Sequence, residues 1–386
     1  MKNPVSITAM ASVSALGSEP GEIWENYKRD SHFLKKHDFN GNISYAAALP
    51  EGLSKEIEAI RKQRSDFRSV DRSVLFAIHA SRQAVKNAGW EKGEEIGINI
   101  GSSRGATGLF EDYYKEFLKE GKAATLASPS TTLGNISSWV AQDLQTNGPE
   151  ISHSVTCSTA LHGVLNGIAW INSGMADKFI AGGSEAALTP FTIAQVQAMR
   201  INAQEDLHYP CQALNLKKAK NSMVLGEGAS VMCLEAGEKE NSLVVIKGIG
   251  FATEALKHSV SISANGSAFQ KSMKMALGEL PSSEVDAIVM HAPGTVKGDL
   301  SEINAIKAVF GEQLPALTTN KWKIGHTFGA SGTLSLELAI MMLQHQEFIP
   351  VPFTSVSTEP KRLKNIIVNA VGFGGNAVSV LVSLPQ

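Results

Sequence analysis

The sequence predicts a layered α/β fold built from two duplicated halves. Strand-like runs of β-branched residues alternate with helix-like runs, in which apolar residues recur every three or four positions, along the 386 residues. Strands that alternate with helices are expected to pair in parallel, because crossover connections cover the sheet faces. The same succession of elements occurs twice. The polar segment GEKENS at 237–242 separates the halves, which we place at 1–240 and 241–386.

The opening elements of the two halves correspond. A strand-like run at 5–17 has its counterpart at 244–256. A helix is predicted next in each half, at 74–88 and at 269–280, because the apolar residues of each run fall on one helical face.

The later elements also correspond. Each half has a buried strand that ends in glycine, at 96–105 and 285–295, and then a turn of small residues that opens a long apolar helix, at 156–171 and 325–343. Each half closes on a glycine-rich turn with strands, at 225–237 and 371–385. With the halves side by side, we expect the two glycine turns to face one another and a site to be built from both.

Composition excludes several classes of protein. The 35 Lys and Arg residues nearly balance 37 Asp and Glu residues, so no basic excess indicates nucleic acid or an anionic membrane. No secretory leader and no apolar run of about 20 residues is seen. The three cysteines show no CxxC spacing, so we expect free thiols, no metal and a reducing cytoplasm.

Cys157 is the candidate nucleophile. It stands in TCSTALHG, where a β-branched run meets the apolar helix, and a helix N-terminus lowers the pKa of a thiol. A lone cysteine among apolar residues is more often an inert core residue, and Cys211 and Cys233 are interpreted in that way.

Five motifs in order carry a family resemblance: TCSTALHG, FIAGGSEAALTP, LGEGASVMCLE, NKWKIGHTFGASG and GFGGNA. With them the chain resembles the β-ketoacyl-acyl-carrier-protein synthases of the thiolase superfamily, over almost its whole length. The resemblance implies a five-layered α/β/α/β/α fold. It also implies no cofactor, since the substrates are carried on the phosphopantetheine of acyl carrier protein.

The resemblance implies roles for individual residues. Cys157 would accept an acyl chain, and a malonyl thioester would then lose carbon dioxide and attack it to give a 3-oxoacyl product. The N–H groups of Cys157 and Phe373 would form the oxyanion hole, and Phe373 matches the aromatic gate of the family. His326 matches the histidine that stabilises the enolate, and Lys321 matches the lysine of the family. The remaining residues of the substrate and oxyanion region are Gly372, Gly374, Gly375, Thr295 and Asn376.

The chain departs from the family at the second histidine. Where the family has Asn-Ala-His-Gly-Thr-Ser-Thr, this sequence has HAPGTVK, with Pro293 at the histidine and Lys297 at the second threonine. Proline cannot donate a hydrogen bond, so the usual site with two histidines is not intact. His291 is the candidate substitute, because residues two apart on a strand share a face. That His291 only packs near the site is an equal alternative.

Other departures lie in the same region. Ser335 stands where the family commonly has a glutamate paired with the lysine, with Glu337 two residues on, and GGNA lacks the usual threonine. We therefore expect a specialised role, for example in polyketide, polyene or pigment synthesis, in place of housekeeping fatty acid elongation.

A basic segment at 61–72 indicates a docking surface for acidic acyl carrier protein. Its five cations include Arg64 and Arg68, and Arg68 falls on a docking position of the family. A solvated charged face is the alternative. The family also implies a homodimer or a heterodimer with another ketosynthase-like subunit.

Two other functions stay open. A subunit that shapes the acyl tunnel of a heterodimeric synthase, like a chain-length factor, fits Pro293 but not the retained Cys157. A carrier-protein acyltransferase or thioesterase would load Cys157 without condensing.

Overall fold

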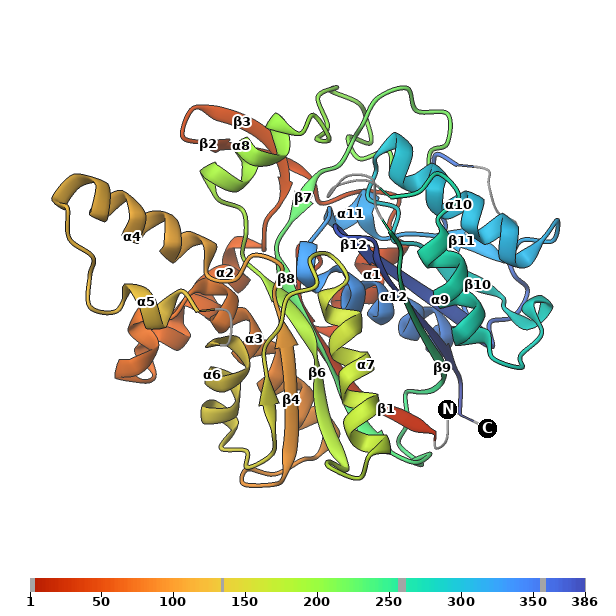
Figure 1. Cartoon of the computed structure of the whole chain (residues 1–386), viewed down its shortest axis with the longest axis horizontal. Coiled ribbons are helices and arrows are strands. Elements are labelled where there is room, and N and C mark those ends of the chain that lie inside the picture. The colour runs from red at the N-terminus through yellow and green to blue at the C-terminus, as the bar shows by residue number, and fades with distance from the viewer. Residues whose placement is uncertain (1–3, 133–134, 256–261, 355–358, 386) are drawn as a thin grey trace.

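The computed structural model describes residues 4–132, 135–255, 262–354 and 359–385. Each half contributes one five-stranded sheet (Figure 1). The first has the order β1-β8-β6-β4-β5, from β1 (Val5–Val13), β4 (Ile96–Gly101), β5 (Glu150–Ile151), β6 (Lys178–Glu185) and β8 (Gly228–Ala236). The second has the order β11-β10-β12-β13-β9, from β9 (Val244–Thr253), β10 (Ala287–Val289), β11 (Ala316–Thr318), β12 (Asn365–Gly372) and β13 (Asn376–Ser383). Read from β1 and from β9, the two orders match strand for strand, so the duplication is confirmed.

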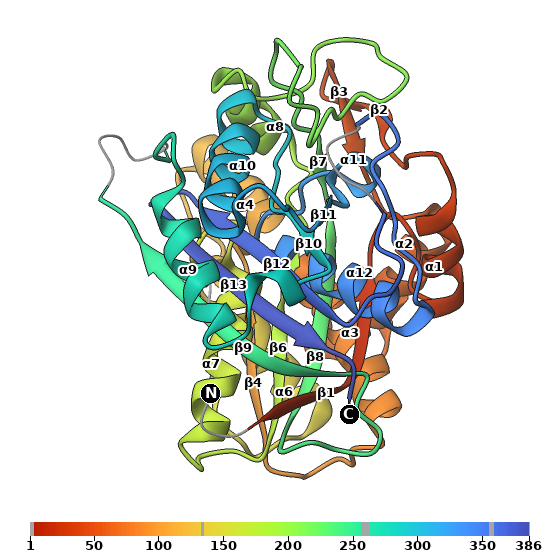
Figure 2. The same cartoon turned by 90° about the vertical axis from the view of Figure 1, so that its right-hand side faces the viewer.

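The helices form three layers around the sheets. On the outer side of the first sheet, α3 (Arg72–Ala88) packs on β1 and β8, and α6 (Asn135–Leu144) on β4. On the outer side of the second sheet, α9 (Ser267–Leu277) covers β9 and β13, and α10 (Val296–Phe310) packs against α9 (Figure 2). Between the sheets lie α7 (Thr159–Asn172) and α12 (Ser331–His345), which contact both sheets and each other. The predicted five-layered arrangement is confirmed.

The central position of α12 explains its sequence. Every residue from Ser331 to Leu343 is buried, because sheets and α7 surround the helix. Close packing of the two central helices needs a small residue: a Cβ at Gly332 would lie only 2.7 Å from Leu161 Cγ. Glu337 is buried in the same helix, and its Oε2 has no hydrogen-bond partner in the described part of the chain.

Several elements were not predicted from the sequence. A small sheet combines β2 (Lys35–Phe39), β3 (Asn42–Ala47) and β7 (Leu225–Gly226). The additional helices are α1 (Pro20–Lys28), α2 (Glu51–Ala59), α4 (Thr107–Glu120), α5 (Ala127–Ser130), α8 (Pro190–Ala198) and α11 (Lys321–Ile324). Short 3₁₀ turns are η1 (Ile60–Lys62), η2 (Ser65–Ser69), η3 (Ser282–Glu284) and η4 (Phe328–Ala330). Among the described residues, no helix is long and apolar enough to cross a membrane.

The expectation of parallel pairing is wrong for half of the strand pairs. β4 is parallel to β5 and β6, and β10 is parallel to β11 and β12. However, β8 is antiparallel to β1 and β6, and β13 is antiparallel to β9 and β12. The reason is the connection: a long loop after α8 leads into β8, and a tight turn joins β12 to β13, so neither strand follows a crossover helix.

The two halves interlock through their glycine turns. Gly226 N–H donates to His326 O over 3.0 Å, and His326 N–H donates to Val224 O over 2.6 Å. In the opposite direction, a Cβ at Gly372 would overlap Thr156 Oγ1 and lie 2.6 Å from Val155 O. The two glycine turns therefore do not face one another, as the sequence analysis expected. Each glycine turn lies against the turn that opens the central helix of the other half.

We expect Glu337→Gln to stabilise the protein increasingly as pH rises. Burial raises the pKa of Glu337 to about 7, above its ordinary 4.5, so its stabilising protonation is lost as pH rises through 7. Glutamine cannot ionise, and the gain between pH 5 and pH 8 should be about 2.5 kcal/mol. Urea unfolding at both pH values measures it. Glu240→Gln, at an exposed position, is the control, and equal pH dependence of the two variants would contradict the prediction.

Candidate active site

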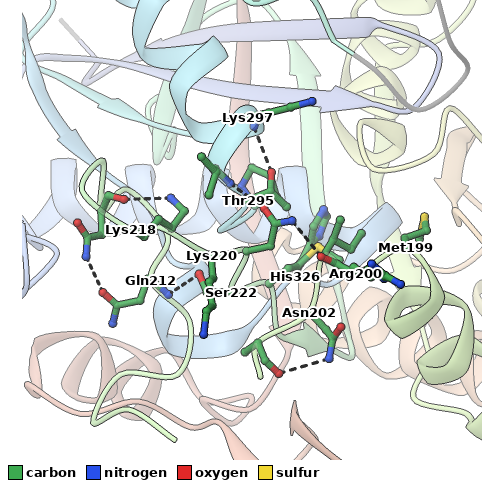
Figure 3. Close-up of a pocket in the computed structure, with 18 of the residues that line it drawn as sticks. Met199, Arg200, Asn202, Gln212, Lys218, Lys220, Ser222, Thr295, Lys297 and His326 are labelled. Carbon is green, nitrogen blue, oxygen red and sulfur yellow. Dashed lines mark hydrogen bonds between the residues drawn. The ribbon is translucent and has the colours of Figure 1, made fainter. Parts of the chain in front are cut away.

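A cavity of about 1010 Å³ lies between the halves. The first half contributes Cys157 and much of the segment 199–223, which follows α8. The second half contributes His291, Pro293, the start of α10, His326, Phe328 and residues 371–373. Figure 3 shows the 199–222 segment, Thr295, Lys297 and His326 around this space. The packing of each glycine turn against the other half thus brings residues far apart in the sequence to one site.

A strained turn presents Cys157 to the cavity. Thr156 has φ 50°, a conformation that β-branched residues rarely adopt. The turn is held by Thr159, whose Oγ1 accepts from Val155 N–H over 2.9 Å and donates to Thr156 O over 2.6 Å. Ser158 is the N-cap of α7, so the thiol lies beside the start of the helix, 7% exposed.

The pKa of Cys157 departs from the sequence expectation. Burial raises the pKa of the thiol to about 12, and the Glu185 carboxyl adds to the rise. The charges of Lys321 and Arg104 act in the opposite direction but do not cancel it. The expected lowering by the start of the helix is therefore wrong for this structure, because desolvation of the thiolate outweighs it. The thiol rests protonated, and its proton must leave as it reacts.

The turn after β12 reaches the nucleophile. Thr156 Oγ1 donates to Phe373 O over 3.3 Å, and Gly375 N–H donates to Gly372 O over 3.1 Å. Gly374 and Gly375 have φ values of 96° and 72°, which explains why glycine stands there. Gly372 and Phe373 line the cavity, and Phe373 is 40% exposed at its mouth.

Three residues of the predicted substrate region do not line the cavity in the described structure. Gly374 and Gly375 shape the turn. Asn376 Oδ1 accepts a hydrogen bond from Thr253 Oγ1 over 2.9 Å, so it supports the sheet edge behind the turn.

His326 is a neutral hydrogen-bond donor directed by the backbone. Phe328 N–H donates to its Nδ1 over 3.1 Å, so the ring proton of the neutral imidazole belongs on Nε2. Burial lowers the pKa of His326 to about 3, and the charge of Lys321 lowers it further. The ring is 2% exposed and lines the cavity with Cys157.

Lys321 is buried without a carboxylate partner. Its Nζ donates to Asn320 Oδ1 over 3.1 Å and to Ser335 Oγ over 3.2 Å, and no salt bridge reaches it in the described part of the chain. Burial lowers the pKa of Lys321 to about 8, while the Glu302 carboxyl is the largest opposing influence. The serine at 335 therefore leaves the lysine with hydrogen bonds but no counter-ion.

Glu185 is a site residue that the sequence analysis missed. Its carboxylate accepts from Ser102 Oγ and Ser103 N–H, both over 2.8 Å, from Arg104 N–H over 3.2 Å and from Gly329 N–H over 2.9 Å. These bonds tie the ends of β4 and β6 to the turn after His326. Burial raises its pKa to about 7. The signal was an acid at the end of an apolar, glycine-containing strand, within FIAGGSE.

The strand argument for His291 is wrong. β10 ends at Val289, and Ala292 has φ 26°, so residues 291–293 form a turn and not a strand face. His291 and Pro293 nevertheless both line the cavity. Thr295 also lines it and is the N-cap of α10, where its Oγ1 accepts from Gly298 N–H over 3.2 Å.

Much of the predicted docking charge is already paired. Arg64 pairs with Asp66 over 2.5 Å, Arg61 with Glu58 over 2.6 Å, and Arg72 with Glu58 and Glu227. Arg68 and Lys62 are exposed. None of the five lines the cavity.

Three cations at the cavity mouth were missed by the sequence analysis: Arg200, Lys220 and Lys297. All are exposed, and Figure 3 places them around the opening. Lys218, also at the mouth, pairs with the buried Asp299 over 2.6 Å. No group of three or more His, Cys, Asp or Glu side chains that could hold a metal occurs in the described residues.

Two family models match the chain. They are the beta-ketoacyl synthase N-terminal domain over residues 2–240 and the C-terminal domain over residues 243–353. The chain belongs to the β-ketoacyl synthase family.

Two relatives from the family match this chain over nearly its full length. The 3-oxoacyl-[acyl-carrier-protein] synthase 2 of Staphylococcus aureus is 26% identical and covers 97% of both chains. The enzyme of the same name from Coxiella burnetii is 26% identical over 99% of both.

Solved structures share the fold. A β-ketoacyl synthase from Burkholderia phymatum has a TM-score of 0.85 at 22% identity over 100% of both chains. The ishigamide ketosynthase/chain length factor has a TM-score of 0.85 at 18% identity, also over 100% of both chains. A ketosynthase in complex with its chain length factor from Xenorhabdus doucetiae has a TM-score of 0.80 at 19% identity, over 99% of this chain and 98% of that one.

We expect Gly372→Ala to slow acylation of Cys157 by about 10² to 10³, because loss of one oxyanion donor has costs of that order. The added methyl group would overlap Thr156 Oγ1 and displace the turn that carries Phe373, whose N–H is the expected second donor. Intact mass after mixing with an acyl-carrier thioester measures the rate. Gly21→Ala, where a Cβ meets nothing within 4 Å, is the matched control. A rate within twofold of the control, in a folded variant, would show that the glycine is dispensable.

Proposed function

We propose that this protein is a β-ketoacyl-acyl-carrier-protein synthase that uses Cys157 as its nucleophile. The observation that carries the proposal is the shared cavity: Cys157, His326 and the Phe373 turn line one space, although they come from different halves. The family membership supports the same reaction class. The pathway that we propose is fatty acid, polyketide, polyene or pigment synthesis, with a specialised role expected.

In the first half-reaction, Cys157 Sγ attacks the carbonyl carbon of an acyl thioester. The C–S bond to phosphopantetheine breaks, and the thiol proton leaves with the departing sulfur. The N–H groups of Cys157 and Phe373 stabilise the oxyanion of the tetrahedral intermediate. The close contact of Gly372 with the turn that carries Cys157 supports the assignment of these two N–H groups as the donors.

In the second half-reaction, His326 donates a hydrogen bond to the malonyl thioester. Its Nε2–H donates to the thioester oxygen as the carboxyl group leaves, because Nδ1 already accepts from Phe328 N–H. Burial and, to a smaller extent, the charge of Lys321 keep the imidazole neutral, so it acts as a hydrogen-bond donor and needs no external proton. Lys321 acts through His326 and is a positioning residue.

The substrates arrive on acyl carrier protein, and no further cofactor is needed. The exposed Arg68 supports docking of an acidic carrier, while Arg64 would have to exchange Asp66 for the carrier. Arg200 and Lys297 add exposed positive charge at the cavity itself, whereas Lys220 pairs with Glu205 over 2.8 Å. A cytoplasmic location belongs to the proposal, because the three cysteines, all in the described residues, are free.

A second candidate function is that of a subunit that shapes the product of another synthase. Pro293 favours it, and two structures with the same fold are of a ketosynthase with a chain length factor. A thiol presented at the cavity favours the synthase. An acyltransferase or thioesterase would use the same thiol and stop before condensation.

Helix α4 offers a face for a second copy of this chain. Figure 1 shows α4 projecting from the side of the molecule. Its exposed apolar residues are Phe110, Tyr114, Phe117 and Leu118, and Leu126 in the following loop is also exposed. The rings of Phe110, Tyr114 and Phe117 stack in a row. Such a patch on a projecting helix indicates an interface, and a two-fold axis lets it pair with itself.

We expect Phe117→Glu to break this association, because a charge would be buried between the copies. Light scattering after gel filtration should change from two chains to one. Met275→Glu on α9, also exposed, is the control. If the wild-type protein is monomeric alone and pairs only with another ketosynthase-like chain, the α4 face binds that subunit and not a second copy.

Two substitutions should separate the half-reactions. Cys157→Ala should abolish the acyl adduct, because no other described thiol lines the cavity. His326→Ala should keep the adduct but lower release of carbon dioxide from malonyl carrier protein by about 10² to 10⁴. Intact mass and trapped carbon dioxide measure the two steps. Unchanged loading in Cys157→Ala, or loss of both steps in a folded His326→Ala, would overturn the assigned roles.

A further inference from the structure

The cavity contains two imidazoles, although Pro293 stands where a second histidine was expected. The rings of His291 and His326 have centroids 5.2 Å apart and lie nearly perpendicular, at 83°. Both side chains are buried, with His291 4% exposed, and both line the cavity beside Cys157. The second imidazole comes from a position two residues earlier in the chain.

The backbone holds His291 in this position. His291 N–H and Ala292 N–H donate to the two oxygens of Glu302, over 3.0 and 2.9 Å. Asn369 Nδ2, from β12, donates to Glu302 Oε1 over 3.1 Å. These bonds stabilise Ala292 at φ 26°, a conformation that costs free energy in alanine and persists only where the surroundings enforce it. The turn therefore fixes His291 against His326.

One ring nitrogen of His291 lacks a partner. Its Nδ1 is buried and has no hydrogen-bond partner in the part of the chain that the structure describes. A buried nitrogen left unpaired destabilises the folded state, so a histidine that only packed would be expected to have its hydrogen bonds satisfied. Because His291 lines the cavity, a bound substrate is the expected source of the missing partner.

The ring is electrically neutral in this setting. The groups facing it are His326, Lys321 and, through the backbone, Glu302. Burial lowers the pKa of His291 well below its ordinary value, and the neighbouring His326 and Lys321 side chains lower it further. A neutral imidazole has one N–H donor and one acceptor nitrogen, so it can donate without exchanging a proton with the substrate.

We propose that His291 is a catalytic residue that donates a second hydrogen bond to the thioester oxygen of the malonyl group, beside His326. The inference rests on the proposed condensing function. The bond between C2 and the carboxyl carbon breaks, its electron pair stays on C2 and spreads to the thioester oxygen, and carbon dioxide leaves. The enolate carbon then attacks the acyl carbonyl on Cys157, and the C–S bond breaks to release the thiolate. Two N–H donors in a buried site stabilise the enolate oxygen.

The first test compares His291→Phe, which keeps a ring but no donor, with His291→Gln, which keeps an N–H donor. Acyl loading of Cys157 should stay within twofold in both. Carbon dioxide release should fall about 10²-fold in the phenylalanine variant and recover at least about tenfold in the glutamine variant. His79→Phe, on α3 outside the cavity, is the control. Wild-type release in His291→Phe, equal loss in both variants, or loss of loading would overturn the proposal.

The second test does not depend on turnover. A malonyl-pantetheine amide, in which nitrogen replaces the thioester sulfur, presents the same oxygen but does not react. On binding, ¹⁵N signals of both His291 and His326 should shift in the wild-type protein. A shift of His326 alone overturns the role of His291. A wild-type protein that binds this probe, loads Cys157 and releases no carbon dioxide overturns the condensing function instead, so the two failures are distinguishable.

Discussion

The site depends on the contact between each glycine turn and the opposite half. Gly372 lies against the Thr156 turn, and Gly226 bonds the backbone of His326, so the same contact occurs twice in the duplicated fold. A side chain at either glycine would push the halves apart, because backbone and side-chain oxygens already fill the space. This close approach brings the nucleophile of one half and the histidine of the other to one cavity.

Burial shifts the pKa values of the side chains at this site. The pKa values of Cys157, His326 and Lys321 all move toward the neutral form, to about 12, about 3 and about 8. Removing an ionised group from water costs more free energy than its interactions with these neighbours recover. The resting thiol and imidazole are therefore uncharged, whereas Lys321 stays mostly a cation near pH 7. Hydrogen-bond donors, directed by backbone bonds such as Phe328 N–H to His326, stabilise the charge that develops on the substrate.

Two departures from the family pattern, Pro293 and Ser335, lie on the side of His326 and Lys321. The side that holds Cys157 keeps the strained turn, the helix start and the glycine contact. The other side has Pro293 without a donor and Ser335 without a charge, yet Lys321 keeps two hydrogen bonds and His291 takes a place beside His326. Changes in residue identity are thus accompanied by local rearrangements that retain polar groups around the substrate space.

Apolar periodicity in the sequence by itself predicted the duplicated halves, and the junction of a β-branched run with an apolar helix predicted Cys157. The ordered motifs, through the family resemblance, implied the five layers and the candidates His326 and Phe373. Tertiary structure alone decided the antiparallel β8 and β13, the anchoring by Glu185, the raised pKa of Cys157 and the direction of His291. Each of these depends on desolvation or on hydrogen bonds between residues distant in sequence. Such contacts exist only after the halves have packed, so no local pattern encodes them.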